Sequence, residues 1–388
     1  MRGMTQSSRR RTVRLACALS LAGLLAPLIP ALGQSPSAPE DVPREGTTVG
    51  ITFVGRMVAD LDRSVAFYEA LGFVRDPAAK PVWRKDPVVE RLYDLHGARD
   101  IDTRMAKMYV VNQDSGERFV LYLRELKGLE RRNLANHTAW DPGVTHFGLV
   151  VPDAQKLWSE LRARGLLHAR SWGGKLVAPP GQTKGMLAYI TDPDGMDIEL
   201  IDQRPAVPAQ DSRPARPALL PGVNHVGVVV LDSDRARAFY GDLLGGHLVT
   251  THAPWLKGDF YDSAVGAHGN ILRFYNESFP FAAESPTPEM LASGRKPTRS
   301  RMNVELVEFQ NRKRPVEARS ITDIGVGYVG FEVRGLDAFL ERAKAAGAIV
   351  VSDGILTMRG GATREVMIRD PDVGAFIELF DHPRKPAH

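Results

Sequence analysis

The sequence predicts an α+β fold in which four βαβββ modules pair with one another. Two observations carry this prediction. A strand that leads directly into a helix occurs four times along the chain, and each copy is followed by further strand-like sequence that ends in a closing strand. Short repeated units of this kind cannot bury their sheets singly, so they are expected to pair with one another.

The clearest copy of the repeat is residues 222–246, GVNHVGVVVLDSDRARAFYGDLLGG. Its first part alternates His225 and Gly227 with valines on the other face, which predicts a strand that is apolar on both sides. Asp232 then caps a helix that ends at two glycines. The apolar residues of this helix recur at helical spacing: Ala236, Phe239, Tyr240 and Leu243.

The other copies keep the same spacing between the strand and the helix cap. The matching strand and cap positions are Phe53 and Asp60, His146 and Asp153, and, in the fourth copy, a strand that starts at Tyr328. The closing strands are FVLYL ending at Leu123, DIELI at Ile201, NVELV at Val307 and FIELF at Phe380. Each module is therefore bounded by a first and a last strand.

Three motifs resemble the vicinal oxygen chelate superfamily: DLDRSVAFYEALGF, DSDRARAFYGDLLGG and DPDGMDIEL. This superfamily includes glyoxalase I, methylmalonyl-CoA epimerase, the extradiol dioxygenases and the metal-free bleomycin-resistance proteins. The resemblance covers about residues 49–381 and implies paired glyoxalase-like half-barrels. It specifies the reaction poorly, because one scaffold hosts several chemistries.

The first 33 residues are expected to be an export signal rather than part of the fold. The arginine-rich start precedes the apolar run Leu15–Ile29 and small residues before Gln34, as in cleavable signals, and SRRRTVRL also permits a twin-arginine route. The alternative is a membrane anchor, but the run is shorter than the roughly 20 residues that a spanning helix needs. We expect a periplasmic or secreted protein with no stable membrane anchor after cleavage.

The remaining chain divides at proline-rich sequence. We expect an N-terminal linker over 34–48, a first glyoxalase-like domain over 49–202, a linker over 203–221 and a second such domain over 222–383. The second linker is largely extended and spans on the order of 60 Å. Its length therefore permits either the pairing of neighbouring modules or the pairing of modules two with three and one with four.

The charge balance argues against a polyanionic partner. Five of the 50 Lys and Arg residues, and none of the 46 acids, lie in residues 1–33. The mature chain is thus close to neutral, which gives no reason to expect nucleic acid or an anionic membrane as a partner. We expect a small-molecule substrate, and the sequence leaves the oligomeric state open.

The resemblance implies metal ligands on the first and last strands of two paired modules. Eight positions match: Phe53, His146, His225 and Tyr328 on first strands, and Tyr122, Glu199, Glu305 and Glu378 on last strands. Modules two and three together offer His146, Glu199, His225 and Glu305, similar to bacterial glyoxalase I. We favour this pairing, while pairing of neighbours would instead offer His225, Glu305 and Glu378.

Two nitrogens and two carboxylates predict one divalent metal, which is Mn, Fe, Co, Ni or Zn. The alternative for each residue is a hydrogen-bonded core histidine or a solvent-facing glutamate. Glu308 competes with Glu305 as a ligand, but an odd offset of three residues places it on the opposite face of the strand.

The favoured function is a metal-dependent isomerase, epimerase or lyase of the glyoxalase type. The metal chelates neighbouring oxygens of a small substrate, and Glu199 or Glu305 moves a proton through an enolate-like intermediate. No thiol-conjugate site is recognisable in the sequence. An extradiol-type dioxygenase and a metal-free binding protein of the bleomycin-resistance type are the alternatives.

One arginine is a candidate for substrate binding. Arg301 shares a strand face with Glu305, roughly 13 Å away at about 3.3 Å per residue, and it follows the basic run Arg295, Lys296 and Arg299. A guanidinium suits a carboxylate or phosphate of a substrate. The alternative is a solvated basic loop.

Overall fold

The fold was analysed in a computed structural model. It describes residues 45–95, 100–113, 116–178, 186–203, 221–249, 254–280, 301–316, 318–358, 361 and 363–382. The expected export signal over 1–33, most of the linkers over 34–48 and 203–221, and Arg295, Lys296 and Arg299 lie outside the described residues.

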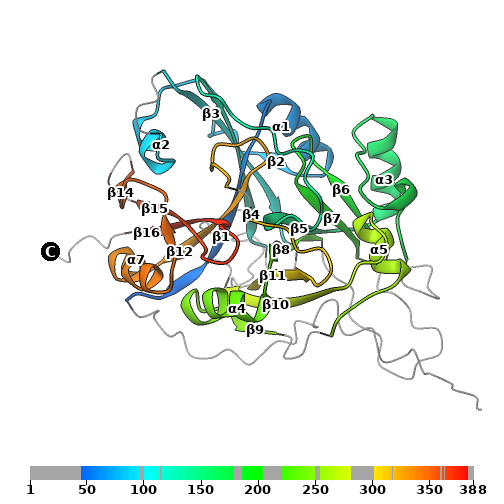
Figure 1. The fold of residues 1–388 in the computed structure, drawn as a ribbon. Coiled ribbons are helices and arrows are strands. Elements are labelled where there is room, and N and C mark those ends of the chain that lie inside the picture. Colours follow the sequence, from blue (N-terminus) through cyan, green and yellow to red (C-terminus); the bar gives the residue numbers. More distant parts are fainter. Residues whose placement is uncertain are drawn as a thin grey trace, which may run out of the picture. The chain divides into compact units, whose positions relative to one another are not determined.

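The elements follow the repeat (Figure 1). Module one contains β1 (Thr48–Met57), α1 (Leu61–Ala70), β2 (Val74–Arg75), α2 (Pro87–Leu92), β3 (Asp102–Val111) and β4 (Arg118–Lys127). Module two contains β5 (Gly143–Val151), α3 (Ala154–Ala163), the short helix η2 (Trp172–Gly174), β6 (Leu187–Thr191) and β7 (Asp197–Asp202).

The second half of the chain repeats this order. Module three contains β8 (Gly222–Val230), α4 (Ser233–Arg237), η3 (Ala238–Leu243), β9 (His247–Leu248), α5 (Asp259–Val265), β10 (Leu272–Pro280) and β11 (Arg301–Phe309). Module four contains β12 (Gly327–Val333), α7 (Leu336–Ala345), β13 (Ile349–Val350), β14 (Leu356–Thr357), β15 (Arg364–Arg369) and β16 (Phe376–Asp381).

Two sheets join the modules in the order two with three and one with four. The seven-stranded sheet runs β6-β7-β5-β8-β11-β10-β9, and the nine-stranded sheet runs β13-β15-β16-β12-β1-β4-β3-β2 with β14 beside β15. In each sheet the two first strands are antiparallel neighbours, and each last strand lies parallel to its own first strand. Each half-barrel is therefore built from one module on either side of the proline-rich linker.

An acidic side chain from each last strand holds the start of the module's helix. The four carboxylates accept from the backbone N–H of the first helical residue, in the pairs Glu125 with Leu61, Asp202 with Ala154, Glu308 with Ser233 and Asp381 with Leu336. Each acid lies three residues after its module's expected ligand position. The odd offset puts it on the opposite face of the strand, as predicted for Glu308, and negative charge is favourable at a helix N-terminus.

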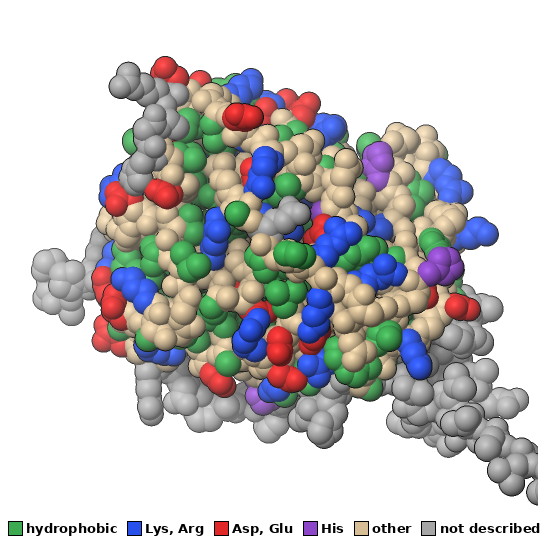
Figure 2. Space-filling model, viewed as in Figure 1, with side chains coloured by type: hydrophobic (Ala, Val, Ile, Leu, Met, Phe, Trp, Pro, Cys, Tyr) green, Lys and Arg blue, Asp and Glu red, His purple; other side chains and the backbone are tan. Residues whose placement is uncertain are grey.

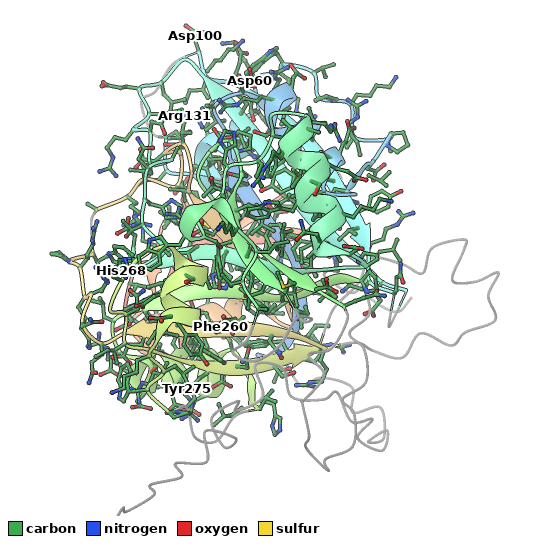
Figure 3. All side chains as sticks on the ribbon, turned by 90° about the vertical axis from the view of Figure 1, so that its right-hand side faces the viewer. Asp60, Asp100, Arg131, Phe260, His268 and Tyr275 are labelled. Atoms are coloured by element: carbon green, nitrogen blue, oxygen red, sulfur yellow. The ribbon has the colours of Figure 1, made fainter. Side chains whose placement is uncertain are left out.

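The N-caps follow the predicted pattern in three modules. Asp60, Asp153 and Asp232 each accept from backbone N–H groups of the first turn, and Asp60 is labelled at the start of α1 in Figure 3. Gly335 takes this place in module four, with a φ of 63° and no side-chain cap. The helix predicted after Asp232 is α-helical only to Arg237 and continues as the π-helix η3.

The helix-covered faces of both sheets contribute to one apolar core. The rings of Tyr68 from α1 and Phe147 from β5 lie 6.4 Å apart, and those of Phe279 and Phe331, which belong to different sheets, lie 5.2 Å apart. The faces that carry the expected ligand positions point away from this core. They are lined by two smaller clusters of buried apolar side chains, one for each sheet.

Module two departs from the predicted βαβββ pattern. Between α3 and β6 its described residues form only isolated bridges, in the pairs Ala169 with Ile190 and Val177 with Leu187, in place of a full strand. None of the helices in the described part of the chain is long and apolar enough to cross a membrane. On the face seen in Figure 2, basic and acidic side chains are intermixed.

Candidate metal centre

Four side chains with metal-binding groups converge on the outward face of the seven-stranded sheet. They are His146 on β5, Glu199 on β7, His225 on β8 and Glu305 on β11, and one ligand atom of each lies within 4.8 Å of the ligand atoms of the others. All four side chains are buried. The sequence placed these residues together, and the structure brings them together because modules two and three share a sheet.

The strand register explains this convergence. His146 lies opposite Gly227 and His225 lies opposite Gly148 in the antiparallel β5–β8 pair. Glu199 is the parallel neighbour of Gly148, and Glu305 is the parallel neighbour of Gly227. An approximate twofold relation between the modules thus places each glutamate beside the histidine of the other module.

The closest contacts cross between modules. His146 Nε2 lies 3.3 Å from Glu305 Oε2, and His225 Nε2 lies 3.2 Å from Glu199 Oε2. Glu305 Oε2 is also 3.9 Å from His225 Nε2. Side chains from both modules therefore surround one common position.

Two glycines make room for the imidazole rings. A Cβ atom on Gly227 would lie 1.9 Å from the ring of His146, and one on Gly148 would lie 2.2 Å from the ring of His225. Any side chain at these positions would displace a ring. The sequence signal is a glycine two residues after each first-strand position, which also holds for Gly55 and Gly330 in the other sheet.

The donor set fits a divalent metal. The Nε2 atoms of His146 and His225 are buried and have no hydrogen-bond partner among the described residues. Burying an unsatisfied polar atom is costly, and a bound cation would remove that cost. Two imidazoles with two carboxylates suit Mn, Fe, Co, Ni or Zn.

Charge interactions within the cluster shift the pKa values of His225 and Glu305 toward their ionised forms. Burial lowers the pKa of His225, but the carboxylates of Glu305 and Glu199 outweigh burial and raise that pKa overall. Burial raises the pKa of Glu305, yet His225 and His146 outweigh it and lower that pKa. Glu305 is therefore held as a negative carboxylate where a cation would bind.

Tyr189 is a further residue of this centre that the sequence did not indicate. It lies on β6 opposite Glu199 and its hydroxyl donates to Glu199 Oε2 at 3.2 Å, while its ring contacts that of His146 at 5.5 Å. Burial, then the charges of Glu199 and Glu305, raises the pKa of Tyr189 well above its ordinary value. The only signal in the sequence is its place on the strand that pairs with DIELI.

Arg301 lies at the start of β11 on the face predicted for it. Its Nε donates to Ser278 Oγ at 2.8 Å and its Nη2 donates to Ser278 O at 2.6 Å, so it is tied to the neighbouring strand β10. Burial lowers its pKa from the ordinary value.

Three of the four matching positions of the nine-stranded sheet hold aromatic rings, and the fourth is Glu378. Phe53 lies 4.9 Å from Tyr122 and 6.1 Å from Tyr328, measured between ring centroids. Glu378 is the parallel neighbour of Gly330, far from Glu305, which lies in the other sheet. The three-ligand alternative of His225, Glu305 and Glu378 is therefore wrong, because neighbouring modules do not share a sheet.

Comparisons with known proteins agree with this architecture. Two sequence profiles of the Glyoxalase/Bleomycin resistance protein/Dioxygenase superfamily match residues 50–200 and 224–366. A lactoylglutathione lyase of Arabidopsis thaliana is 27% identical over 196 residues, which are 50% of this chain and 53% of the relative. The catechol-2,3-dioxygenase of Bacillus subtilis is 28% identical over 153 residues, which are 33% of this chain and 51% of the relative.

The chain spans about half the length of the curated relatives it matches. Among solved structures, glyoxalase I from Zea mays is similar with 18% identity and a TM-score of 0.47, over 86% of this chain and 92% of that chain. On the strength of the two profile matches, which fall on both halves of the repeat, the chain belongs to the Glyoxalase/Bleomycin resistance protein/Dioxygenase superfamily.

Proposed function

We propose that the chain is a metal-dependent isomerase, epimerase or lyase of the glyoxalase type that acts on a small molecule with two neighbouring oxygens. The observation that supports this most directly is the buried set of His146, Glu199, His225 and Glu305, with ligand atoms within 4.8 Å of one another. Two buried imidazole nitrogens, each within 3.3 Å of a buried carboxylate, form a donor set that suits a divalent metal better than a metal-free binding pocket.

A bound metal would supply Lewis-acid polarisation of the substrate oxygens, which would lower the barrier to removing a proton from the adjacent carbon. His146 and His225 would hold it from the two first strands, where their rings pack closely over Gly227 and Gly148. The carboxylates contribute charge and a proton acceptor. Transfer of the proton between two adjacent carbons then requires one carboxylate that can reach both.

Glu305 is the better candidate for the mobile base. Glu199 is held by the hydroxyl of Tyr189 at 3.2 Å as well as by His225. Glu305 contacts the two histidines that a metal would engage. When those nitrogens bind a cation, Glu305 is left with fewer restraints than Glu199, and we assign it the proton transfer and Glu199 the more static role.

Arg301 is proposed to bind an anionic group of the substrate. It lies on the same strand face as Glu305, four residues away along β11, and no carboxylate lies within 4.0 Å of it among the described residues. The hydrogen bonds to Ser278 fix its position without neutralising its charge.

Ring cleavage of a catechol-like substrate with oxygen is the second candidate. The similarity to the catechol-2,3-dioxygenase of Bacillus subtilis favours it. Four protein ligands leave fewer open positions for substrate and oxygen than a set of two histidines and one carboxylate, which favours the isomerase or lyase. Oxygen consumption in an electrode with a panel of catechols distinguishes the two.

Metal analysis tests the proposal directly. Protein loaded with Mn, Fe, Co, Ni or Zn and then desalted should retain about one ion per chain, and His146→Ala and His225→Ala should each lose it. Glu378→Ala is the matched control, because Glu378 holds the same position in the other sheet. Retention of metal by both histidine variants, or no retention by the wild type, would overturn the metal centre.

A further inference from the structure

The nine-stranded sheet has a cavity of its own on the module-one side. It has a volume of about 300 Å³ and lies between the segment Ala78–Arg84 and strands β3 and β4. Its lining includes Thr103 and Met105 from β3 and Arg124 from β4. The register pairs Met105 with Arg124 and Lys107 with Tyr122, so these side chains share the outward face that in the other sheet carries the metal centre.

The charged residues that line this cavity are all basic. They are Lys80, Arg84, Arg104 and Arg124. Two of them are neutralised by acids, Arg84 by Asp86 at 3.3 Å and Arg104 by Asp62 and Glu125 at 2.9 and 2.7 Å. Among the described residues, no carboxylate lies within 4.0 Å of Lys80 or of Arg124.

The half-buried guanidinium of Arg124 lies 5.7 Å from the centroid of the Tyr93 ring and has no carboxylate in direct contact among the described residues. Its Nη1 donates to Thr103 Oγ1 at 3.3 Å and its Nη2 to Met105 Sδ at 3.4 Å, which are long contacts to neutral and weak acceptors. Its Nε is buried and has no hydrogen-bond partner in the described part of the chain. A guanidinium presents a fork of donors that matches a carboxylate or phosphate.

Two acidic side chains, Glu365 and Glu378, interact with Arg124 through their charge. Burial, then the charge of Glu365, raises the pKa of Glu378 well above its ordinary value. Burial also raises the pKa of Glu365 to about 7, although Arg124 opposes this shift. These two carboxyls therefore oppose each other's ionisation, and among the described residues neither forms a direct ion pair with Arg124.

We propose that the cavity beside Arg124 is a binding site for a small organic carboxylate, separate from the metal centre. The carboxylate pairs with Arg124 and Lys80, and the apolar body of the ligand packs against Ala78, Val82 and Met105. The cavity and the metal centre lie on different sheets, so the site does not depend on the proposed reaction.

The chemistry of the lining selects this class of ligand. Two cations without a carboxylate partner favour an anion, and a guanidinium binds a planar carboxylate in two parallel hydrogen bonds. Alanine, valine and methionine side chains offer no hydrogen bonds to a sugar or a base. A cavity of about 300 Å³ falls at the lower end of the range for small-molecule sites.

Calorimetric titration of the full chain with benzoate, phenylacetate, hexanoate and inorganic phosphate tests the site. We expect at least one of the carboxylates to bind more tightly than phosphate. Arg124→Gln should weaken that binding by about 30-fold or more, since truncating one partner of a buried charge pair is costly. Lys80→Gln, at an exposed position where folding is not at risk, should weaken it by about threefold to tenfold.

The matched control is Arg118→Gln. Arg118 is six residues earlier on β4, also has a buried Nε without a partner among the described residues, and stacks on Tyr109 at 4.2 Å, but it does not line the cavity. It should bind the carboxylate like the wild type. His146→Ala should also keep Arg124-dependent binding, which separates this site from carboxylates bound at a metal.

Three results would overturn the proposal. The first is no binding of any of the three carboxylates at millimolar concentration. The second is binding that Arg124→Gln and Lys80→Gln leave unchanged. The third is binding that disappears in His146→Ala, which would assign the ligand to the metal centre.

Discussion

Replacing Gly227 with alanine should abolish metal binding although all four ligand residues are kept. Gly227 lies opposite His146 in the β5–β8 pair. A Cβ at this position would lie 1.9 Å from Cε1, 2.2 Å from Nδ1 and 2.4 Å from Nε2 of the His146 ring. The ring therefore has to move, because the added Cβ is fixed to the backbone of a strand that pairs on both sides.

The size of the shift follows from these contacts. Ordinary contact begins at about 3.4 Å, so the ring has to retreat by about 1.5 Å from a Cβ that would be 1.9 Å away. Metal–ligand distances tolerate only about 0.2 Å. Changes outside the ligand shell typically cost 10–100-fold in metal affinity, so displacing a ligand should cost at least about 100-fold. Overpacking should lower the free energy of unfolding by about 1–3 kcal/mol.

Gly55→Ala is the matched control for steric damage. A Cβ on Gly55 would lie 1.9 Å from the ring of Tyr328, the counterpart of the His146 ring in the nine-stranded sheet. The two variants should lose similar amounts of stability in urea unfolding of the metal-free protein. Only Gly227→Ala should lose metal affinity, measured by titrating metal-free protein with Ni²⁺ or Zn²⁺.

Comparing the two variants distinguishes a general packing defect from the displacement of a metal ligand. Wild-type affinity in Gly227→Ala would refute the assignment of His146 as a ligand held by close packing. An equal loss of affinity in Gly55→Ala would show that the effect spreads through the fold, and would refute the local reasoning.

Three further predictions concern single side chains. Tyr189→Phe removes the hydroxyl that holds Glu199, so metal affinity should fall about 10–100-fold, and unchanged affinity would contradict the contact. Burial raises the pKa of Glu365 to about 7 from an ordinary 4.5, so the stability that its protonated form contributes is complete below about pH 4.5 and is lost as the pH rises through 7. In urea unfolding, the wild type should lose on the order of 2 kcal/mol of unfolding free energy between pH 5 and 8 relative to Glu365→Gln. Parallel pH profiles of the two proteins would argue against this assignment. Arg301→Ala should raise KM about tenfold for an anionic substrate and leave metal content unchanged, since it removes a contact remote from the reacting atoms; unchanged kinetics would assign Arg301 to the surface.

Local sequence determined the modules and the kinds of residue at each site. The alternation of His225 and Gly227, the cap at Asp232 and the closing strands depend on neighbours a few residues away, and the repeat showed which positions correspond. The opposite orientation of Glu308 and Glu305 followed from strand periodicity alone, and the structure bears this out because Glu308 holds the start of α4.

The sequence also fell short where backbone detail is set by packing. The strand expected between α3 and β6 is reduced to isolated bridges, and the helix after Asp232 changes to a π-helix at Ala238. Periodicity predicts which face is buried, but not whether enough partners lie alongside to complete a strand or keep an α-helical register.

Only the tertiary structure decided which modules share a sheet. The linker over 203–221 reaches far enough for either pairing, so chain length imposed no choice, and the pairing of β5 with β8 depends on contacts between residues about 80 apart in the chain. That register is what sets His146 against Gly227 and Glu305. In the same way, the β6–β7 register places Tyr189 beside Glu199. Arg124 and Lys80 line the same cavity because the segment Ala78–Arg84 packs beside β3 and β4. Contacts between distant segments arise from the packing of whole faces, which no local pattern encodes.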